Sequence, residues 1–116
     1  MERRSNLIEE NDKQLYDENI SSNLVSSMEA LKVLFQLLTA PGLEEWGRNF
    51  MDQFQDEMKR DLEEDEEKAE VLLEVMESLG KIYEDDEEWI DSKKDELEEF
   101  LTVIEDLKEL LPEDEE

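Results

Sequence analysis

The chain has 116 residues, and its 38 acidic and 12 basic residues give a formal net charge of −26. It contains no histidine and no cysteine, which excludes a Ser-His-Asp triad, a Cys-His nucleophile, the usual zinc sites and any disulfide. A charge of this sign argues against anionic membranes and nucleic-acid phosphates as direct partners, and favours a basic protein surface. Because hydrophobic residues still make up 37% of the chain, and many recur at helical spacing, we expect a folded helical core.

The first 20 residues have little periodicity, and we expect either a weakly ordered segment or a short helix capped by Ser5. The next helix is predicted to begin at Ser21, Ser22 or Asn23, because these residue types favour N-caps. The N-terminal sequence carries two arginines without an apolar run behind them, which is not typical of a signal peptide.

A broad apolar face recurs every three or four residues from Leu24 to Thr39. The only charged residues in this segment are Glu29 and Lys32, so it is predicted to be the most buried helix. The sequence Ala40-Pro41-Gly42 is expected to end it, since proline and glycine both oppose helix continuation.

A long apolar row begins near Leu43 and continues to Leu79. Its members include Trp46, Phe50, Phe54, Met58, Leu62, Ala69, Leu73 and Met76. The row fits either one helix of about ten turns or two helices joined near Glu63–Glu67, where like charges repel one another most strongly. Gly80 is expected to end this segment in the left-handed conformation.

The last helix is predicted to begin near Asp85 or Asp86, both of which are good N-cap residues. Ser92 followed by Asp95 resembles a loose capping box, which would divide the helix. Pro112 is expected to end the pattern.

These elements predict one all-α domain, with three to four helices in a small up-down bundle with a long central helix. Residues 1–20 would precede the acidic bundle of residues 21–111, and residues 112–116 would form a frayed acidic tail. No run of apolar residues approaches the length of a membrane span. The absence of cysteine favours the cytoplasm.

Most of the negative charge lies in the C-terminal half of the chain. Residues 1–60 hold 12 acids and 7 bases, a net charge of −5, and residues 61–116 hold 26 acids and 5 bases, a net charge of −21. The acids there fall into two rows at three- and four-residue steps, each separate from the apolar face of its helix. The first row is Glu63, Glu67, Glu70, Glu74 and Glu77, and the second is Glu84, Glu87, Asp91, Asp95, Glu98, Glu105 and Glu109. If the two helices pack through their apolar faces, both rows point outward, and these twelve carboxylates are our candidates for partner binding.

Successive carboxylates in such a row would lie about 5–6 Å apart, a spacing comparable with that of phosphates along a nucleic-acid strand. We therefore expect a nucleic-acid mimic that inhibits or regulates a basic nucleic-acid-binding protein. The alternative is that the rows are merely solvated helix faces. A net charge of about 2–8 is enough to keep a small domain soluble, so the excess charge favours a binding function.

The run Glu96–Glu116 (ELEEFLTVIEDLKELLPEDEE) resembles the phage-encoded antirestriction DNA mimics, as do the small size, the helical pattern and the lack of cysteine. The resemblance implies a small acidic helical protein of a phage or another mobile element that occupies the DNA site of a restriction enzyme, in some cases as a dimer. It covers composition and the C-terminal helix. Residues 1–60, with seven bases, are less acidic than that class.

The aromatic row Trp46, Phe50 and Phe54, continued by Met58, has the four-residue spacing that is typical of core residues. As an alternative, it would form an exposed groove for a basic amphipathic helix, with the acids as a steering rim. The chain would then be an adaptor or a chaperone-like module. A homodimer through part of this face is a third arrangement that the sequence leaves open.

No cofactor, metal site or catalytic residue is predicted. An EF-hand register starting at Asp61 would place Glu66 where glycine is needed and Leu72 where the bidentate glutamate belongs. The chain has three glycines and no glycine-rich phosphate loop. Nothing singles out one carboxylate pair for acid–base chemistry, so we expect a binding protein and not an enzyme.

Overall fold

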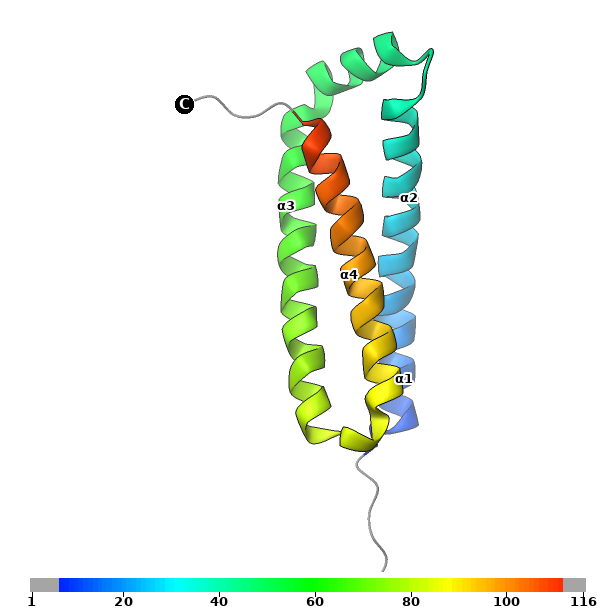
Figure 1. Ribbon diagram of the computed structural model, residues 1–116, viewed down its shortest axis with the longest axis vertical. Coiled ribbons are helices and arrows are strands. Elements are labelled where there is room, and N and C mark those ends of the chain that lie inside the picture. Colours follow the sequence, from blue (N-terminus) through cyan, green and yellow to red (C-terminus); the bar gives the residue numbers. More distant parts are fainter. Residues whose placement is uncertain (1–6, 112–116) are drawn as a thin grey trace, which may run out of the picture.

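A computed structural model describes residues 7–111, which form helices joined by short loops (Figure 1). In chain order, the elements are α1 (Glu10–Tyr16), a π-helical segment (Asp17–Ser21), α2 (Ser22–Thr39), α3 (Glu44–Ile82), a short 3-10 helix (Glu84–Asp86) and α4 (Glu87–Leu110). The chain stays helical from α1 through α2, so these elements make one continuous rod and the described part contains three rods. The predicted all-α class and the predicted number of helices are confirmed.

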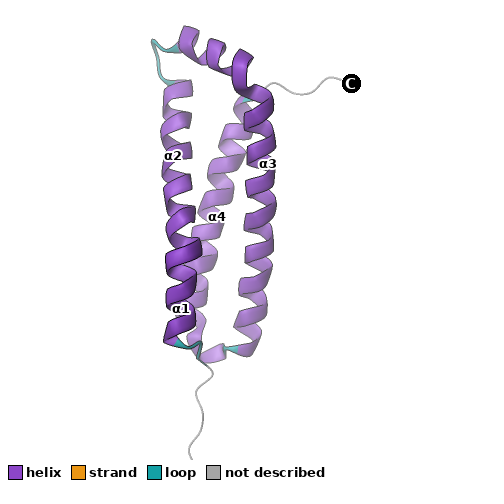
Figure 2. Cartoon of the chain, turned by 180° about the vertical axis from the view of Figure 1, so that it is seen from behind, coloured by secondary structure: helices purple, strands orange, loops and turns teal. Residues whose placement is uncertain are grey.

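Helix α4 is the element against which both other rods pack. Helices α2 and α4 run in the same direction and α3 runs in the opposite direction, while the first turns of α3 lie across one end of the rods (Figure 1). Viewed from behind, the connecting loops lie at the two ends of the molecule (Figure 2). Helices α2 and α3 touch each other much less than either touches α4.

The core is concentrated between α3 and α4. The largest fully buried side chains are Leu62, Met76, Leu97, Ile104 and Leu107. Helix α2 contributes only Leu24 and Met28 to the buried core residues, neither of them fully buried, and leaves Val33 and Leu37 exposed. The prediction that α2 is the most buried helix is therefore wrong. Its apolar face is broad enough to contact two helices, but it packs closely only against α4.

The helix that contains Ser21 does not begin there, so the predicted N-caps at Ser21, Ser22 and Asn23 are wrong. Ser21 has helical dihedral angles, φ −59° and ψ −46°, and its side chain makes no capping hydrogen bond. Since the preceding turns already provide carbonyl acceptors, a cap is unnecessary, and the Ser21 hydroxyl instead donates to Glu96 on α4. The predicted cap Ser5 lies outside the described residues.

Helix α2 ends before Pro41, as predicted, and Gly42 takes the left-handed conformation with φ 91°. Helix α3 is one continuous helix of 39 residues, which decides between the two predicted alternatives. The predicted stop at Gly80 is wrong, since α3 continues to Ile82 and Gly80 has no positive φ.

Helix α4 begins at Glu87, next to the two predicted caps, and Asp86 makes no capping hydrogen bond. Asp86 instead accepts a hydrogen bond from the backbone N–H of Ile8 at 3.0 Å and forms an ion pair with Lys13 at 2.9 Å. Its carboxylate thus holds Ile8 and α1 against the α3–α4 turn. Ser92 does not divide α4, which runs unbroken to Leu110. Pro112 and the predicted tail lie outside the described residues.

Candidate binding surfaces

The two acidic rows lie on the outside of α3 and α4, except that Glu84 lies in the 3-10 helix between them, and all twelve residues are exposed. In both helices, row members directly follow core residues that recur at seven-residue intervals. These pairs are Leu62–Glu63, Ala69–Glu70 and Met76–Glu77 in α3, and Ile90–Asp91, Leu97–Glu98 and Ile104–Glu105 in α4. One residue is a rotation of 100° about the helix axis. Because α3 and α4 are antiparallel and face each other through these core residues, the same rotation brings both rows to the same side of the pair.

The rows are closest to each other near the α3–α4 turn. Glu77, Glu84, Glu87 and Asp91 line one hollow of about 510 Å³, together with Lys81 and Lys94 among others. At the other end of the pair, the ion pair between Lys108 and Glu66, at 3.0 Å, fixes how α4 lies along α3. Glu63 therefore lies near the end of the second row that contains Glu105 and Glu109. The predicted residues thus form one extended acidic face rather than one compact cluster.

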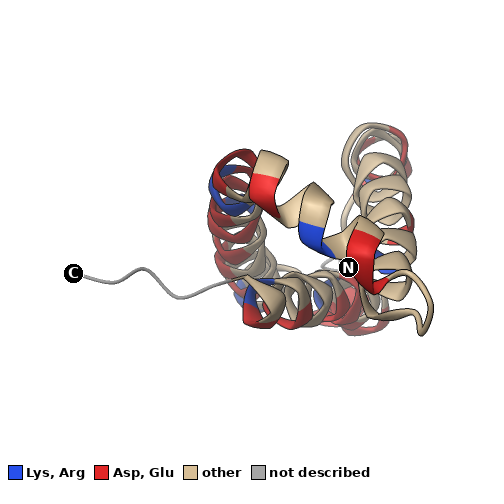
Figure 3. Ribbon diagram, turned by 90° about the horizontal axis from the view of Figure 1, so that it is seen from above, with Lys and Arg blue, Asp and Glu red and all other residues tan. Residues whose placement is uncertain are grey.

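Several lysines of the described residues form ion pairs with acids that lie outside the two rows. Besides Lys108, ion pairs are formed by Lys13 with Asp86, Lys32 with Glu99, and Lys93 with Asp17 and Glu96. None of the twelve row carboxylates forms an ion pair with a lysine or arginine within residues 7–111. Seen from the end of the bundle, acidic residues recur along α3 and α4 among uncharged and basic residues, whereas α2 carries few charges (Figure 3). The acidic face is therefore exposed and its carboxylates form no ion pair within the described residues, while Lys81 and Lys94 lie beside it in the hollow near the α3–α4 turn.

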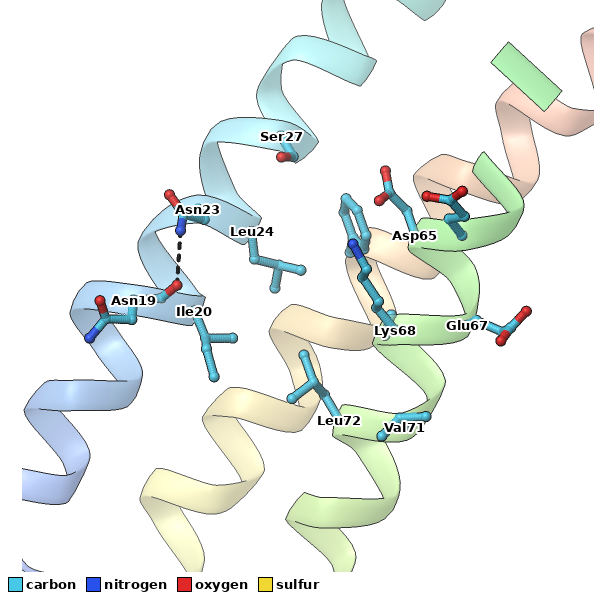
Figure 4. A pocket seen from close by; sticks show the side chains of 13 residues that line it. Asn19, Ile20, Asn23, Leu24, Ser27, Asp65, Glu67, Lys68, Val71 and Leu72 are labelled. Atoms are coloured by element: carbon cyan, nitrogen blue, oxygen red, sulfur yellow. Dashed lines mark hydrogen bonds between the residues drawn. The ribbon is translucent and has the colours of Figure 1, made fainter. Parts of the chain in front are cut away.

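A second surface feature is a groove of about 720 Å³ between α2 and α3, which we call the α2–α3 groove (Figure 4). Its deepest residues are Leu24, Ala69 and Phe100, all buried in the core. Ile20 and Leu72 point into it from the two sides (Figure 4). Sequence analysis did not predict this groove, because it depends on how far α2 and α3 stand apart.

The α3 edge of this groove is charged, whereas its α2 edge is neutral. Glu64, Asp65, Lys68 and the row residue Glu67 line the α3 side. Burial raises the pKa of Asp65, with smaller contributions from neighbouring acids and an opposing one from Lys68. The raised pKa indicates a carboxylate that is incompletely hydrated and would gain from a nearby cation.

A partly buried polar cluster joins the π-helical segment to α4. The Nζ atom of Lys93 lies 2.8 Å from Asp17 Oδ1, 3.4 Å from Ser21 Oγ and 5.5 Å from the centre of the Trp89 ring. The Asp17 contact is an ion pair without hydrogen-bond geometry. Sequence analysis missed this cluster, since a lysine on an acidic helix is usually a surface residue.

Tyr16 borders the same cluster. Its ring packs edge-on against Trp89, with ring centres 5.6 Å apart, and its buried hydroxyl has no hydrogen-bond partner among the described residues. Burial, and then the charges of Glu96 and Asp17, raise the pKa of Tyr16 to about 12. We interpret the cluster as a structural junction, because its charged groups are satisfied by one another.

The aromatic row differs from the prediction that it is core. Phe50 is half-buried and Met58 is buried, but 41% of Trp46 and 38% of Phe54 are exposed. The three aromatic rings stack in sequence, with centres 5.3 Å and 5.1 Å apart. The prediction is wrong for Trp46 and Phe54, because the first turns of α3 cross the end of the bundle and have no neighbour on one side.

Within residues 7–111, no cluster of acidic side chains is arranged to hold a metal ion, and no helix combines the length and the apolar character that crossing a membrane requires. Comparison of the chain with protein-family models, with curated proteins and with solved structures gives no match.

Proposed function

We propose that this chain is an acidic binding protein that mimics nucleic acid and inhibits a basic nucleic-acid-binding protein. The observation that supports the proposal is the acidic face, in which twelve exposed carboxylates on α3, α4 and the turn between them form no ion pair with a lysine or arginine of the described residues. A protein surface that binds phosphates with Lys and Arg would accept these carboxylates in their place. Release of the counterions condensed on both surfaces would add to the binding free energy.

The geometry also supports this function through the arrangement of the rows. Successive carboxylates within a row are separated by about one helical turn, or 5–6 Å, and the two rows lie on neighbouring helices whose axes are typically about 8–10 Å apart. A basic groove shaped for nucleic acid would therefore meet two roughly parallel lines of negative charge. The likeness to antirestriction DNA mimics makes a restriction enzyme of a bacterial host the first partner to test.

The test is capture of partners from a bacterial lysate at low salt, followed by elution with salt and with duplex DNA. The row variant carries Glu70→Gln, Glu74→Gln, Asp91→Asn and Glu98→Gln. A matched control variant carries four substitutions of exposed acids outside the rows and has the same net charge: Glu29→Gln, Glu45→Gln, Asp56→Asn and Glu57→Gln.

We expect wild type and the control variant to retain a nucleic-acid-binding protein that duplex DNA displaces, and the row variant to retain much less of it. Single substitutions should each have a small effect, because exposed charge pairs contribute only about 0.2–1 kcal/mol each. Equal retention by the row and control variants would mean that the charge acts without regard to position, and the mimicry proposal would then fail.

A second candidate function is an adaptor or chaperone-like module that binds a basic amphipathic helix. The partial exposure of Trp46 and Phe54 favours it, since exposed aromatic residues are frequent anchors at protein interfaces. The substitution Trp46→Ala tests this role, with circular dichroism as the control for folding. Loss of a salt-resistant partner from a folded variant would support the adaptor, whereas unchanged binding would exclude Trp46 as its anchor.

A further inference from the structure

The α2–α3 groove exists because the bundle has three rods and α4 packs against both of the others. Helices α2 and α3 are splayed apart on the far side of α4, so the position that a fourth helix occupies in a four-helix bundle is open. The floor of this position is made by core residues, including Phe100 and Leu24. An occupant would therefore extend the existing core rather than rest on a polar surface.

The apolar surface of the groove extends beyond its floor. Leu72 lies half-buried in its wall, and Val71, which also lines it, is 59% exposed. Val71 thus exposes apolar surface beside the buried ring of Phe100. A bound partner would remove this surface from water. At about 25 cal/mol for each square ångström of apolar surface buried, such burial favours binding.

The charged residues along the edges of the groove indicate what kind of partner would bind there. Glu64 and Asp65 lie along its α3 edge, and Asp61 lies close enough to Asp65 to act on its charge. Lys68 is the one cation among the described residues that line the groove, and the opposite edge carries the uncharged residues Asn19 of the π-helical segment and Asn23 and Ser27 of α2. A helix with cations along one flank would thus meet acids on the α3 side and uncharged groups on the α2 side.

We propose that the α2–α3 groove binds an amphipathic helix of a partner protein, with its apolar face on Phe100 and its lysine or arginine side chains along Glu64 and Asp65. This inference goes beyond nucleic-acid mimicry and does not rest on it. Most of the acidic face lies on the side of the plane through α3 and α4 that is opposite to the groove, and Glu67 is the one row residue that also lines the groove. Substitutions that leave Glu67 in place can therefore disable one surface without the other. A second copy of the chain is a poorer occupant, because each copy carries a net charge of −26.

The dimensions fit a short helix. The residues that line the groove extend from Asn19 to Ser27 on one side and from Glu64 to Leu72 on the other. At a rise of 1.5 Å per residue, each edge is about 12 Å long, which corresponds to roughly two turns of a bound helix.

The first test uses a fluorescent synthetic peptide of about 14 residues, four helical turns, in which leucines form one helix face and lysines the other. Its acidic counterpart replaces every lysine by glutamate, and a scrambled peptide keeps the composition without the apolar face. The substitution Ser27→Trp places a bulky ring in the groove. Its matched control, Ser26→Trp, makes the same change at an exposed neighbour that does not line the groove.

We expect the lysine peptide to bind wild type and the Ser26→Trp variant with affinities within about twofold of each other, and Ser27→Trp to weaken binding by about tenfold or more, as loss of one well-packed contact does. The glutamate and scrambled peptides should not bind detectably. Equal binding of the two tryptophan variants, or equal binding of the lysine and scrambled peptides, would overturn the proposal.

The second test separates the groove from the acidic rows. The pair Glu64→Gln and Asp65→Asn removes two charges from the groove edge, and the pair Glu70→Gln and Glu74→Gln removes two from the first row. The groove pair should weaken peptide binding and reduce its salt dependence, whereas the row pair should leave the peptide affinity within about twofold. An equal effect of both pairs would show attraction by net charge alone and would overturn the proposal.

Sedimentation equilibrium completes the test. A monomer that binds the peptide supports the proposal. A dimer that dissociates on Ser27→Trp but not on Ser26→Trp would show that a second copy fills the groove, and would overturn it. Failure of the mimicry proposal in the lysate experiment would leave the peptide result unaffected.

Discussion

Lys93 is the residue whose replacement tests the packing of the π-helical segment most sharply. We consider Lys93→Met, which keeps the length and the apolar stem of the side chain but removes its charge. The ammonium group lies within 2.8 Å of Asp17 and 3.5 Å of Glu96, and 5.5 Å from the centre of the Trp89 ring. Without it, two carboxylates and an aromatic ring would surround an uncharged side chain.

The expected loss of stability follows from the exposure of the three partners. Breaking a fully buried ion pair by removing one partner costs about 3–5 kcal/mol. The side chain of Lys93 is 11% exposed, but those of Asp17 and Glu96 are 46% and 28% exposed. Once the lysine is lost, water can therefore solvate part of both carboxylates, although Asp17 Oδ1 itself is buried. We therefore expect a loss of about 2 kcal/mol. At this chain length, that corresponds to a fall in Tm of about 8 °C.

Thermal and urea unfolding, followed by circular dichroism, measure this loss. The matched control is Lys94→Met, which changes the net charge equally on the neighbouring residue. Lys94 is half-buried and forms no ion pair within residues 7–111, so its replacement should change stability by no more than about 0.5 kcal/mol. Equal unfolding free energies for the two variants would refute the assigned role of Lys93.

Two further predictions concern single positions. Tyr16→Phe should leave stability unchanged or raise it by up to about 1 kcal/mol in urea unfolding, because the buried hydroxyl has no partner to lose. Since the folded pKa of Tyr16 is about 12, above the value of about 10 in an unfolded chain, wild type should lose stability relative to Tyr16→Phe as the pH rises from 10 to 12; a constant difference would contradict the raised pKa. Gly80→Ala should stabilise the protein by up to about 1 kcal/mol, since Gly80 is helical and a new Cβ would meet Ile90 at an ordinary 3.9 Å. Gly42→Ala should destabilise it by about 1 kcal/mol because of its positive φ, and thermal unfolding of the two variants would expose an error if their order were reversed.

The features that were predicted correctly from the sequence are those that depend on the helical periodicity of the apolar and acidic residues. The apolar row from Trp46 to Met76 identifies α3, and the acids beside it are exposed as that periodicity requires. Local stop and start signals were less reliable. Gly80 and Ser21 have the residue types of a stop and a cap, but each lies within a helix whose packing against α4 outweighs its local preference.

The remaining features depend on distances between elements that are remote in the sequence. The α2–α3 groove requires Ile20 and Leu72 to stand apart across Phe100, and no periodicity encodes that separation. The burial of Lys93 depends in the same way on Asp17, which precedes it by 76 residues. Acidic helical chains share the composition of this one whether or not they contain such sites, so composition alone could not identify them.

Direct competition tests the central claim, that the acidic face takes the place of nucleic acid. The captured partner is mixed with fluorescent duplex DNA, and the apparent Kd for DNA is measured at increasing concentrations of this chain. The account predicts that the apparent Kd rises in proportion to the concentration of the chain, with no complex that contains all three components. A stable ternary complex, with the partner holding DNA and this chain together, would contradict it.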